Sequence, residues 1–220
     1  MLFERLLVHD GGAAADAALN MAIDEALLEQ ANLPTLRFYG WQRPSLSFGY
    51  FGKFSDVAHE REHRDLVRRW TGGGSVLHGE DLTYSLATPA TESAAALGPA
   101  TIYAALHGAI RAALRRDGRE AELAAAAAPK VSDACFANPV RDDVLLLGRK
   151  VAGAAQRRTR RGFLHQGSIQ IAGLDESFRE RFAAALAPTV QQTKISSPIL
   201  ERAAELAAEK YRTEEWLRRW

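Results

Sequence analysis

The stretch Arg68-Arg69-Trp70-Thr71-Gly72-Gly73-Gly74-Ser75-Val76-Leu77-His78 is the most informative part of this 220-residue sequence. Three successive glycines leave a length of backbone without side chains, so a ligand can lie directly against exposed N–H groups. The two arginines before the run can supply positive charge to a carboxylate, a thioester oxygen or a phosphate. The alternative interpretation is a loose hairpin turn. No Gly-Lys-Ser/Thr follows the run and no Gly-x-Gly-x-x-Gly opens a helix, so the phosphate-loop and dinucleotide fingerprints do not fit.

The composition is that of an ordinary soluble globular protein, with 47% hydrophobic and 25% charged residues. A formal net charge of +1 gives no reason to expect a nucleic-acid or membrane-surface partner. No apolar run approaches the roughly 20 residues of a membrane span, and the first residues lack the apolar core of a secretion signal. These features predict a cytoplasmic protein.

Cysteine and histidine usage argues against a metal site. Cys135 is the only cysteine, which excludes an internal disulfide and any multi-cysteine metal centre and suits a reducing compartment. Of the six histidines, only His59 and His63 have a metal-ligand spacing. That pair lies in a highly charged stretch, which favours a solvated helix face over a metal site, and we expect no metal.

Hydrophobic periodicity predicts one α+β domain over residues 1–220, with a mostly antiparallel mixed sheet flanked by helices. The helix predicted for 13–30 buries a stripe that leaves Asp24 and Glu25 on other, solvated faces. The glycine run is expected at the turn between the strands 66–70 and 75–78. Further strands are predicted at 2–8, 36–41, 45–50 and 82–87, and a three-stranded meander at 144–147, 150–156 and 163–171. The second turn of this meander is the basic stretch 157–162, which is either a solvated hairpin tip or a docking point for an acidic partner. Helices are predicted at 56–63, 101–116 and throughout the region after 175.

Two further features can carry chemistry. Lys150 lies in a strand of small residues, Gly148-Arg149-Lys150-Val151-Ala152-Gly153-Ala154-Ala155-Gln156, which leaves room for a ligand beside its ammonium group. The alternative is a surface lysine on an edge strand. Cys135 is either a small buried hydrophobe or a nucleophile. As a nucleophile it needs a nearby cation, because a free thiol titrates near pH ~8.5. Lys150 can be that cation if the fold brings the two together.

Four ordered motifs give the chain a family resemblance. They are Arg-Arg-x-Thr-Gly-Gly-Gly-x-Val-x-His with Leu82-Thr83-Tyr84-Ser85, then the Lys150 strand, then His165-Gln166-Gly167-Ser168-Ile169. Together with Asn20 to Leu27 and Leu36 to Trp41, they resemble the superfamily of lipoate–protein ligases, octanoyltransferases and biotin–protein ligases. The resemblance implies the α+β catalytic domain of that superfamily. It also implies attachment of an octanoyl or lipoyl group to a lysine of a small carrier domain in 2-oxo-acid dehydrogenases or the glycine cleavage system.

Within this superfamily the chain most resembles the cysteine-dependent octanoyltransferases of the Bacillus type, whose Cys-Phe pair matches Cys135-Phe136. The resemblance implies that Cys135 accepts the octanoyl group from octanoyl–acyl carrier protein as a thioester, without a cofactor, while Lys150 lowers the thiol pKa and holds the acyl carbonyl. The acyl-enzyme then passes the group to a lysine of a lipoyl domain or of the glycine cleavage H protein. The residues implied to bind the substrate are Arg69, Thr71, Gly72, Gly73, Gly74, His78, Gly153, His165 and Gly167.

One motif departs from this branch. The branch has Gln-His-Gly where this chain has His165-Gln166-Gly167, with the first two residues in the opposite order.

Three alternatives remain. An ATP-dependent lipoate–protein ligase, or its catalytic subunit, would use ATP and Mg²⁺, with Lys150 binding lipoyl-adenylate and Cys135 incidental. A lipoyl amidotransferase would move the acyl group between carrier proteins. A non-catalytic acyl-carrier-binding module is the least favoured.

Overall fold

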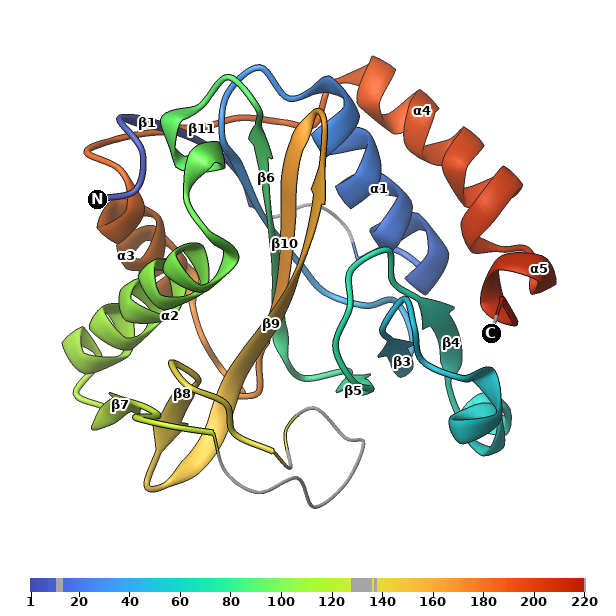
Figure 1. Cartoon of the computed structure of the whole chain (residues 1–220), viewed down its shortest axis with the longest axis horizontal. Coiled ribbons are helices and arrows are strands. Elements are labelled where there is room, and N and C mark those ends of the chain that lie inside the picture. The colour runs from blue at the N-terminus through green and yellow to red at the C-terminus, as the bar shows by residue number, and fades with distance from the viewer. Residues whose placement is uncertain (11–13, 128–135, 137, 220) are drawn as a thin grey trace.

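The structure, a computed structural model, describes residues 1–10, 14–127, 136 and 138–219. Within these residues the strands form an eight-stranded sheet in the order β11-β1-β2-β6-β10-β9-β8-β7 and a three-stranded sheet in the order β4-β3-β5 (Figure 1). The larger sheet consists of β1 (Arg5–His9), β2 (Thr35–Tyr39), β6 (Leu82–Pro89), β7 (Ala121–Leu123), β8 (Val144–Leu146), β9 (Arg149–Thr159), β10 (Gly162–Ile169) and β11 (Thr189–Gln192). The smaller sheet consists of β3 (Ser45–Phe48), β4 (Asp65–Arg68) and β5 (Val76–His78).

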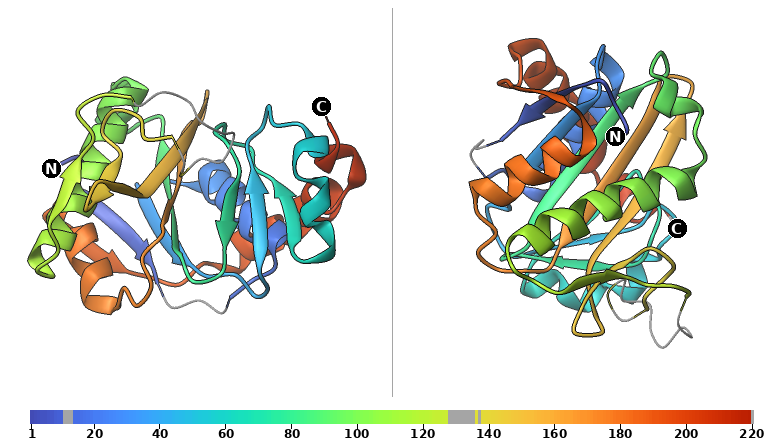
Figure 2. Two further views of the ribbon diagram at one scale, coloured as in Figure 1. Left: turned by 90° about the horizontal axis from the view of Figure 1, so that it is seen from below. Right: turned by 90° about the vertical axis from the view of Figure 1, so that its left-hand side faces the viewer.

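Helices cover both faces of the larger sheet, with α2 and α3 on one face and α1 on the other, and α4 packs against α1 (Figures 1 and 2). Asp16 caps the first turn of α1 by accepting a hydrogen bond from the Leu19 N–H. The α-helices are α1 (Ala17–Gln30), α2 (Pro99–Arg116), α3 (Glu176–Leu186), α4 (Ser197–Leu206) and α5 (Glu214–Leu217). Single turns are η1 (Phe54–Asp56), η2 (Ala58–Glu62), η3 (Ser93–Ala96) and the π-turn η5 (Ala207–Tyr211).

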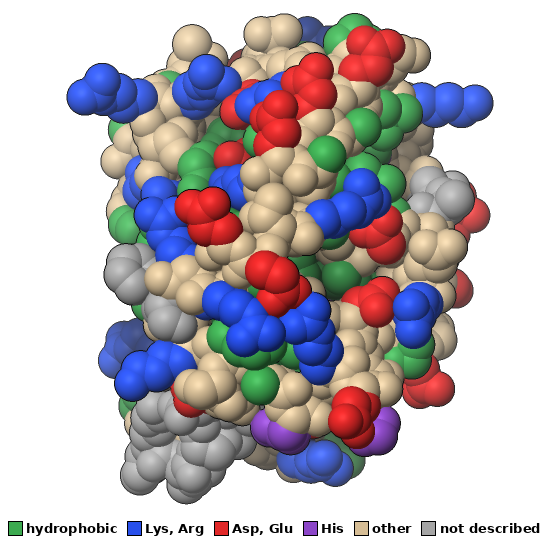
Figure 3. All heavy atoms as spheres, turned by 90° about the vertical axis from the view of Figure 1, so that its right-hand side faces the viewer, with side chains coloured by type: hydrophobic (Ala, Val, Ile, Leu, Met, Phe, Trp, Pro, Cys, Tyr) green, Lys and Arg blue, Asp and Glu red, His purple; other side chains and the backbone are tan. Residues whose placement is uncertain are grey.

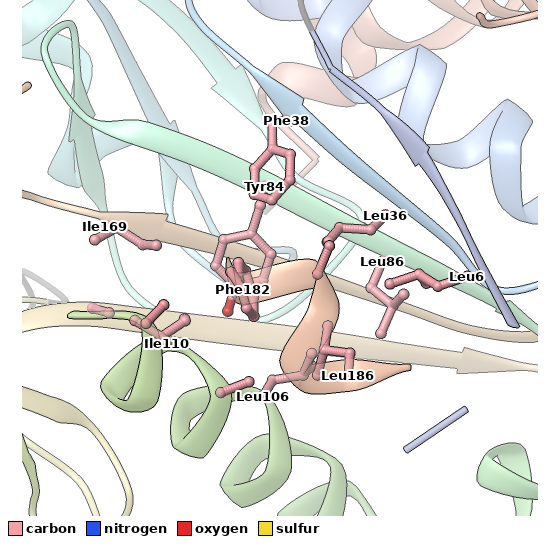
Figure 4. Close-up of a cluster of buried hydrophobic side chains, with 14 of the residues drawn as sticks. Leu6, Leu36, Phe38, Tyr84, Leu86, Leu106, Ile110, Ile169, Phe182 and Leu186 are labelled. Atoms are coloured by element: carbon pink, nitrogen blue, oxygen red, sulfur yellow. The ribbon is translucent and has the colours of Figure 1, made fainter. Parts of the chain in front are cut away.

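The main hydrophobic core lies between the larger sheet and helices α2 and α3 (Figure 4). Leu36 of β2 and Leu86 of β6 meet Ile110 of α2 and Phe182 of α3, and all four side chains are buried. Because strand side chains alternate between faces, the residues next to Leu36 and Leu86 on their strands face α1 instead. Each such apolar side chain contributes about 1.5–3 kcal/mol through burial, and the sheet is thereby fixed at the position where its other face meets α1.

The fold class is confirmed, because a mixed, mostly antiparallel sheet is flanked by helices. The predicted meander is also confirmed: β8 pairs with β9 and β9 with β10, both antiparallel. The interpretation of the last segment is wrong in one respect. Residues 189–192 form β11, a short strand that runs parallel to β1 at the edge of the sheet, so the region after Asp175 is not entirely helical. Among the described residues, no helix combines the length and apolar character that crossing a lipid bilayer requires.

The glycine run does not join neighbouring strands. Strands β4 and β5 lie on opposite sides of β3, to which β4 is parallel and β5 antiparallel. The connection between them therefore crosses the end of β3 and is not a hairpin, so the hairpin expectation was wrong. This crossing places the glycines against the backbone that follows β3.

The expectation that Asp24 and Glu25 are solvated was also wrong. The exposed fractions of the two residues are 0% and 6%. Helix α1 is packed on one side by the larger sheet and on another by α4 and η5, so more than one of its faces is buried. Both carboxylates have hydrogen-bond partners: those of Asp24 are described below, and Glu25 accepts from Tyr211, which is buried, and from Lys210, which is partly exposed.

Candidate active site

A pocket lies where α1, the smaller sheet and strands β6, β9 and β10 meet. Five of the predicted substrate-binding residues line it, namely Arg69, Gly73, His78, Gly153 and Gly167. Its other lining residues are Met21, Tyr39, Trp41, Ser47, Val76, Thr83, Ala154, Ala155, Gln166 and Ser168. Apolar side chains and small residues therefore form most of the wall, and a few polar groups converge on it, as expected for a small-molecule site.

The guanidinium of Arg69 holds the glycine run in place. It donates to the carbonyl oxygens of Gly72 at 2.9 Å and Gly74 at 2.7 Å, and to Ser47 Oγ at 2.7 Å. Gly73, between these two carbonyls, has a φ of +86°, a conformation that only glycine adopts without strain. Arg69 therefore holds the loop in shape from inside.

The glycine run also packs directly on Gly49, just after β3. A Cβ atom at position 49 would lie 2.0 Å from the Gly73 carbonyl oxygen and 2.7 Å from the Gly72 carbonyl carbon. Both contacts are with backbone, which cannot move aside without displacing the loop. The close approach of two chain segments thus requires glycine at position 49.

Gly49→Ala is expected to lower the free energy of unfolding by at least about 1–3 kcal/mol, because overpacking forces the backbone apart. Urea denaturation of the purified protein measures the change. Gly79→Ala is the control, since a Cβ there has no heavy atom within 4 Å. Equal unfolding free energies for the two variants would contradict the packing described here.

Arg68 has a different role from Arg69. Its side chain has no solvent exposure and donates to the carbonyl oxygens of Tyr50, Gly52, Trp216 and Leu217 at 2.6–2.9 Å. These acceptors belong to the loop after β3 and to α5. Arg68 thus connects two segments of the chain and does not line the pocket.

His78 lies at the centre of a buried hydrogen-bond chain on the pocket wall. Its Nδ1 is 2.8 Å from Asp81 Oδ2 and its Nε2 is 2.7 Å from Ser47 Oγ. A carboxylate can only accept, so Nδ1 carries the proton and Nε2 accepts from the Ser47 hydroxyl. Trp41 stacks on the imidazole, with ring centroids 4.0 Å apart. Burial lowers the pKa of His78, which keeps the ring neutral near pH 7.

Asp81 stays ionised beneath this chain. Burial alone would raise its pKa, but hydrogen bonds from His78, Ser168 and the Gly79 N–H outweigh that effect and lower it. Thr83 also donates to Asp81 at 2.9 Å. The sequence analysis identified neither Ser47 nor Asp81, although Asp81 lies between two of the quoted motifs, three residues after His78.

A second buried network supports the pocket from α1. Asp24 accepts hydrogen bonds at 2.6–2.9 Å from Arg37, Tyr39, Ser85 and Gln166. The Oε1 of Gln166 accepts in turn from the Thr71 hydroxyl at 2.8 Å. Thr71 is fully buried and does not line the pocket, so its link to Gln166 fixes the start of the glycine run. The available sequence signal for Asp24 was the adjacent pair Asp24-Glu25 in the middle of the predicted helix.

Lys150 lies on the same strand as Gly153, three residues before it, but does not itself line the pocket. At about 3.3 Å per residue, this places its Cα about 10 Å along β9 from Gly153. Its ammonium forms a buried ion pair with Asp143 at 2.8 Å and lies 5.5 Å from the centroid of the Phe136 ring. Phe136 directly follows Cys135, which itself lies outside the described residues.

His165 lies in a different environment from the pocket-lining residues. It is fully buried near Tyr84, Tyr103 and His107, with ring centroids 5.9–6.5 Å from its own. The neighbouring Gln166 takes the place on the pocket wall. The order of these two residues therefore decides which side chain faces the pocket, and the predicted substrate-binding role of His165 has no counterpart in the pocket lining.

Two buried histidines make stability depend on pH. Burial lowers the pKa of His107 to about 4, and burial together with the charge of His107 lowers that of His165 to about 3. Within the described residues, His107 Nε2 and His165 Nδ1 have no hydrogen-bond partner, so protonating either ring would bury an unpaired N–H. Both groups bind protons more weakly in the folded state than in the unfolded state. Their effect on the free energy of unfolding is therefore absent above the unfolded pKa of about 6.5. As the pH falls below that value, the free energy of unfolding decreases.

Between pH 7 and pH 5, each of these histidines is expected to reduce the free energy of unfolding by about 2 kcal/mol. Urea denaturation at both pH values measures the difference. His165→Gln should remove about half of the combined decrease, whereas His59→Gln should not change it, because the His59 side chain is 74% exposed. The same pH dependence in wild type and His165→Gln would exclude His165 as a cause.

The His59–His63 pair and the basic turn at 157–162 lie outside the pocket lining. His59 lies beside Glu60 on the surface, and among the described residues no three histidine, cysteine or acidic side chains cluster in a way that could hold a metal ion. In the basic turn, Arg157 stacks over Tyr50 and Trp70, and Arg158 donates to the carbonyl oxygens of Ala95 and Leu97. On the face that carries α4, α5 and the smaller sheet, basic and acidic side chains are interspersed (Figure 3).

Several known proteins are similar to this chain in sequence. The sequence pattern of the lipoyl protein ligase A/B catalytic domain matches residues 16–213. The chain is 39% identical over 165 residues to the octanoyltransferase LipM of Oceanobacillus iheyensis, covering 71% of this chain and 60% of that protein. It is 37% identical over 181 residues to LipM of Bacillus subtilis, covering 74% and 64%. The chain thus spans somewhat less than two thirds of the length of these relatives.

Solved structures show the same fold. A crystal structure of lipoate-protein ligase A bound with ATP superimposes with a TM-score of 0.75 at 22% identity, covering 99% of this chain and 98% of that one. A bipartite lipoate protein ligase from Thermoplasma acidophilum, studied with its E2 lipoyl domain, gives a TM-score of 0.70 at 21% identity, covering 97% and 94%. At these identities the likeness concerns the fold alone.

Proposed function

We propose that this chain, which belongs to the lipoyl protein ligase A/B catalytic domain family, transfers an octanoyl group from an acyl carrier protein to a lysine of a lipoyl carrier domain. The transfer passes through a thioester on Cys135 and takes place in the cytoplasm. The acceptors are the lipoyl domains of 2-oxo-acid dehydrogenases or the glycine cleavage H protein. Sequence identities of 36–39% to proteins named octanoyltransferase support the reaction class.

The observation that carries the proposal is the contact between Phe136 and Lys150. Phe136 follows Cys135 in the sequence, and its ring centroid is 5.5 Å from the Lys150 ammonium. Lys150 in turn lies on the strand that forms the pocket wall at Gly153. A cation beside a thiol favours the thiolate, which is the nucleophilic form.

The chemistry requires two steps. In the first, the Cys135 thiolate attacks the carbonyl carbon of the donor thioester, a new carbon–sulfur bond forms, and the donor thiolate leaves. In the second, the amine of the acceptor lysine attacks the acyl-enzyme, the carbon–nitrogen bond forms, the Cys135 thiolate leaves, and the nitrogen loses a proton. Each step replaces one acyl bond with another, so neither step needs ATP or a redox partner. In both, the Lys150 ammonium stabilises the negative charge that develops on the carbonyl oxygen.

We propose that the octanoyl chain enters this pocket. Met21, Trp41 and Val76 supply apolar wall, and the glycine run with Gly153 and Gly167 lets the backbone approach the acyl chain closely. Burial of each methylene contributes about 0.8 kcal/mol. We propose that Arg69, Thr71, Gly72 and Gly74 maintain this shape, that His78 forms one polar wall, and that His165 acts only from behind the strand.

An intact-mass experiment tests the proposal. Incubation with octanoyl–acyl carrier protein should add one octanoyl group to the wild type, and addition of a lipoyl domain should transfer that group to the domain. Cys135→Ala should gain no mass. If instead free lipoate with ATP and Mg²⁺ modifies the lipoyl domain and Cys135→Ala is equally active, the chain is a ligase and the proposal is wrong. Transfer to a second carrier from an octanoylated carrier domain alone would indicate an amidotransferase, and binding without transfer would indicate an acyl-carrier-binding module.

A further inference from the structure

The ammonium group of Lys150 is held by a carboxylate that the proposed reaction does not use directly. Lys150 Nζ lies 2.8 Å from Asp143 Oδ2, and the exposed fractions of the two side chains are 3% and 0%. A buried ammonium is costly without an ionised partner and additional hydrogen bonds. Asp143 therefore helps to fix where the ammonium lies.

Asp143 is itself fixed from several directions. The Val140 N–H donates to its Oδ2 at 2.7 Å, and the Tyr103 hydroxyl donates to its Oδ1. Its own carbonyl oxygen accepts from the Ala124 N–H at 2.9 Å. Because both carboxylate oxygens and the adjacent backbone are engaged, the carboxylate cannot rotate without breaking a hydrogen bond.

Helix α2 contacts two successive residues, Asp142 and Asp143. His107 follows Tyr103 by one helical turn, and its Nδ1–H donates to the Asp142 carbonyl oxygen at 2.7 Å. Asp142 has a φ of +67°, in the left-handed region that residues other than glycine rarely adopt. Burial raises the pKa of Tyr103 and Asp143 raises it further, so the phenol keeps the proton that it donates. Burial lowers the pKa of His107, so that ring stays neutral.

We infer that Asp143 and Tyr103 are positioning residues that aim the Lys150 ammonium at the acyl carbonyl. The inference rests on the function proposed above, in which Lys150 contacts the reacting group. Neither Asp143 nor Tyr103 needs to touch the substrate, since both act through Lys150. His107 supports them by holding the strained backbone at Asp142.

The chain contains a matched control at another site. Tyr211 donates to Glu25, and Glu25 pairs with Lys210 at 2.6 Å, which repeats the tyrosine–carboxylate–lysine arrangement. This second set packs between α1 and η5, away from the pocket lining and from Lys150. Tyr211→Phe therefore removes the same kind of buried hydrogen bond as Tyr103→Phe without altering the surroundings of Lys150.

Steady-state octanoyl transfer separates positioning from stability. Tyr103→Phe is expected to lower kcat about tenfold while KM stays within about twofold, because a small displacement of a catalytic group slows the chemical step more than binding. Tyr211→Phe should lose comparable thermal stability and keep the wild-type kcat. An equal fall of kcat in both variants, or an unchanged kcat in Tyr103→Phe, would overturn the inference.

A chemical-labelling measurement gives a readout that does not depend on transfer. Limited acetylation followed by peptide mass spectrometry yields the ratio of Lys150 to Lys210 labelling within each sample. Tyr103→Phe and Asp143→Asn are expected to raise this ratio several-fold, because Lys150 is released from its buried pairing, whereas Tyr211→Phe should not raise it. An unchanged ratio in both variants would overturn the inference. A wild type that transfers no octanoyl group would refute the proposed function, and the ratio would still decide the placement of Lys150.

Discussion

Lys150→Ala is expected to lower kcat for octanoyl transfer by at least about 100-fold, the effect of removing a charge-stabilising donor from an acyl-transfer site. The substitution removes the ammonium that lies beside Phe136 and Asp143. Single-turnover formation of the octanoyl-enzyme, followed by intact mass, measures the loss at the first chemical step. Retention of more than about a tenth of the wild-type rate would show that Lys150 is not part of the machinery.

A stability control is required because the same substitution leaves Asp143 buried without its cation. Breaking a buried ion pair by removing one partner costs about 3–5 kcal/mol. Lys150→Ala/Asp143→Ala removes both charges and should recover part of that stability without recovering activity. A double variant that regained activity together with stability would assign the loss in Lys150→Ala to unfolding.

Asp24→Asn is expected to lower the free energy of unfolding by about 3–5 kcal/mol, because it leaves the Arg37 guanidinium buried without its carboxylate. Arg37 Nη1 lies 2.7 Å from Asp24 Oδ1, and the two side chains are 5% and 0% exposed. Urea denaturation measures the change. The asparagine amide would also place an N–H₂ group among the donors of Tyr39, Ser85 and Gln166.

The matched comparison is with Asp16, which caps α1 at its exposed start. Asp16→Asn keeps an oxygen that can accept from the Leu19 N–H, so it should cost well under 1 kcal/mol. Arg37→Met combined with Asp24→Asn should be less destabilising than the sum of the single changes, since each removes the other's unpaired partner. A loss below about 1 kcal/mol for Asp24→Asn would show that the carboxylate is not the centre of this network.

The sequence predicted the elements whose signals are local. The antiparallel meander of β8, β9 and β10 follows from short apolar runs separated by turn residues, and the left-handed conformations at Leu147 and Gly148 complete the first of those turns. Helix α2 follows from a long periodic stretch closed by Asp117-Gly118. These features depend on neighbours within a few residues, which the sequence displays directly.

Contacts between distant segments were harder to predict. The path of the glycine run across β3 depends on a parallel pairing between β3 and β4, which leaves no periodic signal. Residues 189–192 form a strand because β1 offers an open edge, not because of their own polar sequence. The side of the sheet on which His165 lies depends on register, since a shift of one residue exchanges the two faces. For this reason the motif identified the right strand but assigned the pocket position to His165, when Gln166 occupies it.

Arg68 connects α5, near the C-terminus, to the segment that leads into the glycine run. The indole Nε1–H of Trp216 donates to the Arg68 carbonyl oxygen at 3.0 Å, while the Arg68 side chain donates to the Trp216 carbonyl oxygen at 2.9 Å. The glycine run begins at Gly72, four residues after Arg68. If the proposed acyl ligand displaces that loop, the polarity around the buried indole of Trp216 would change, so intrinsic fluorescence is expected to follow ligand binding without an added probe.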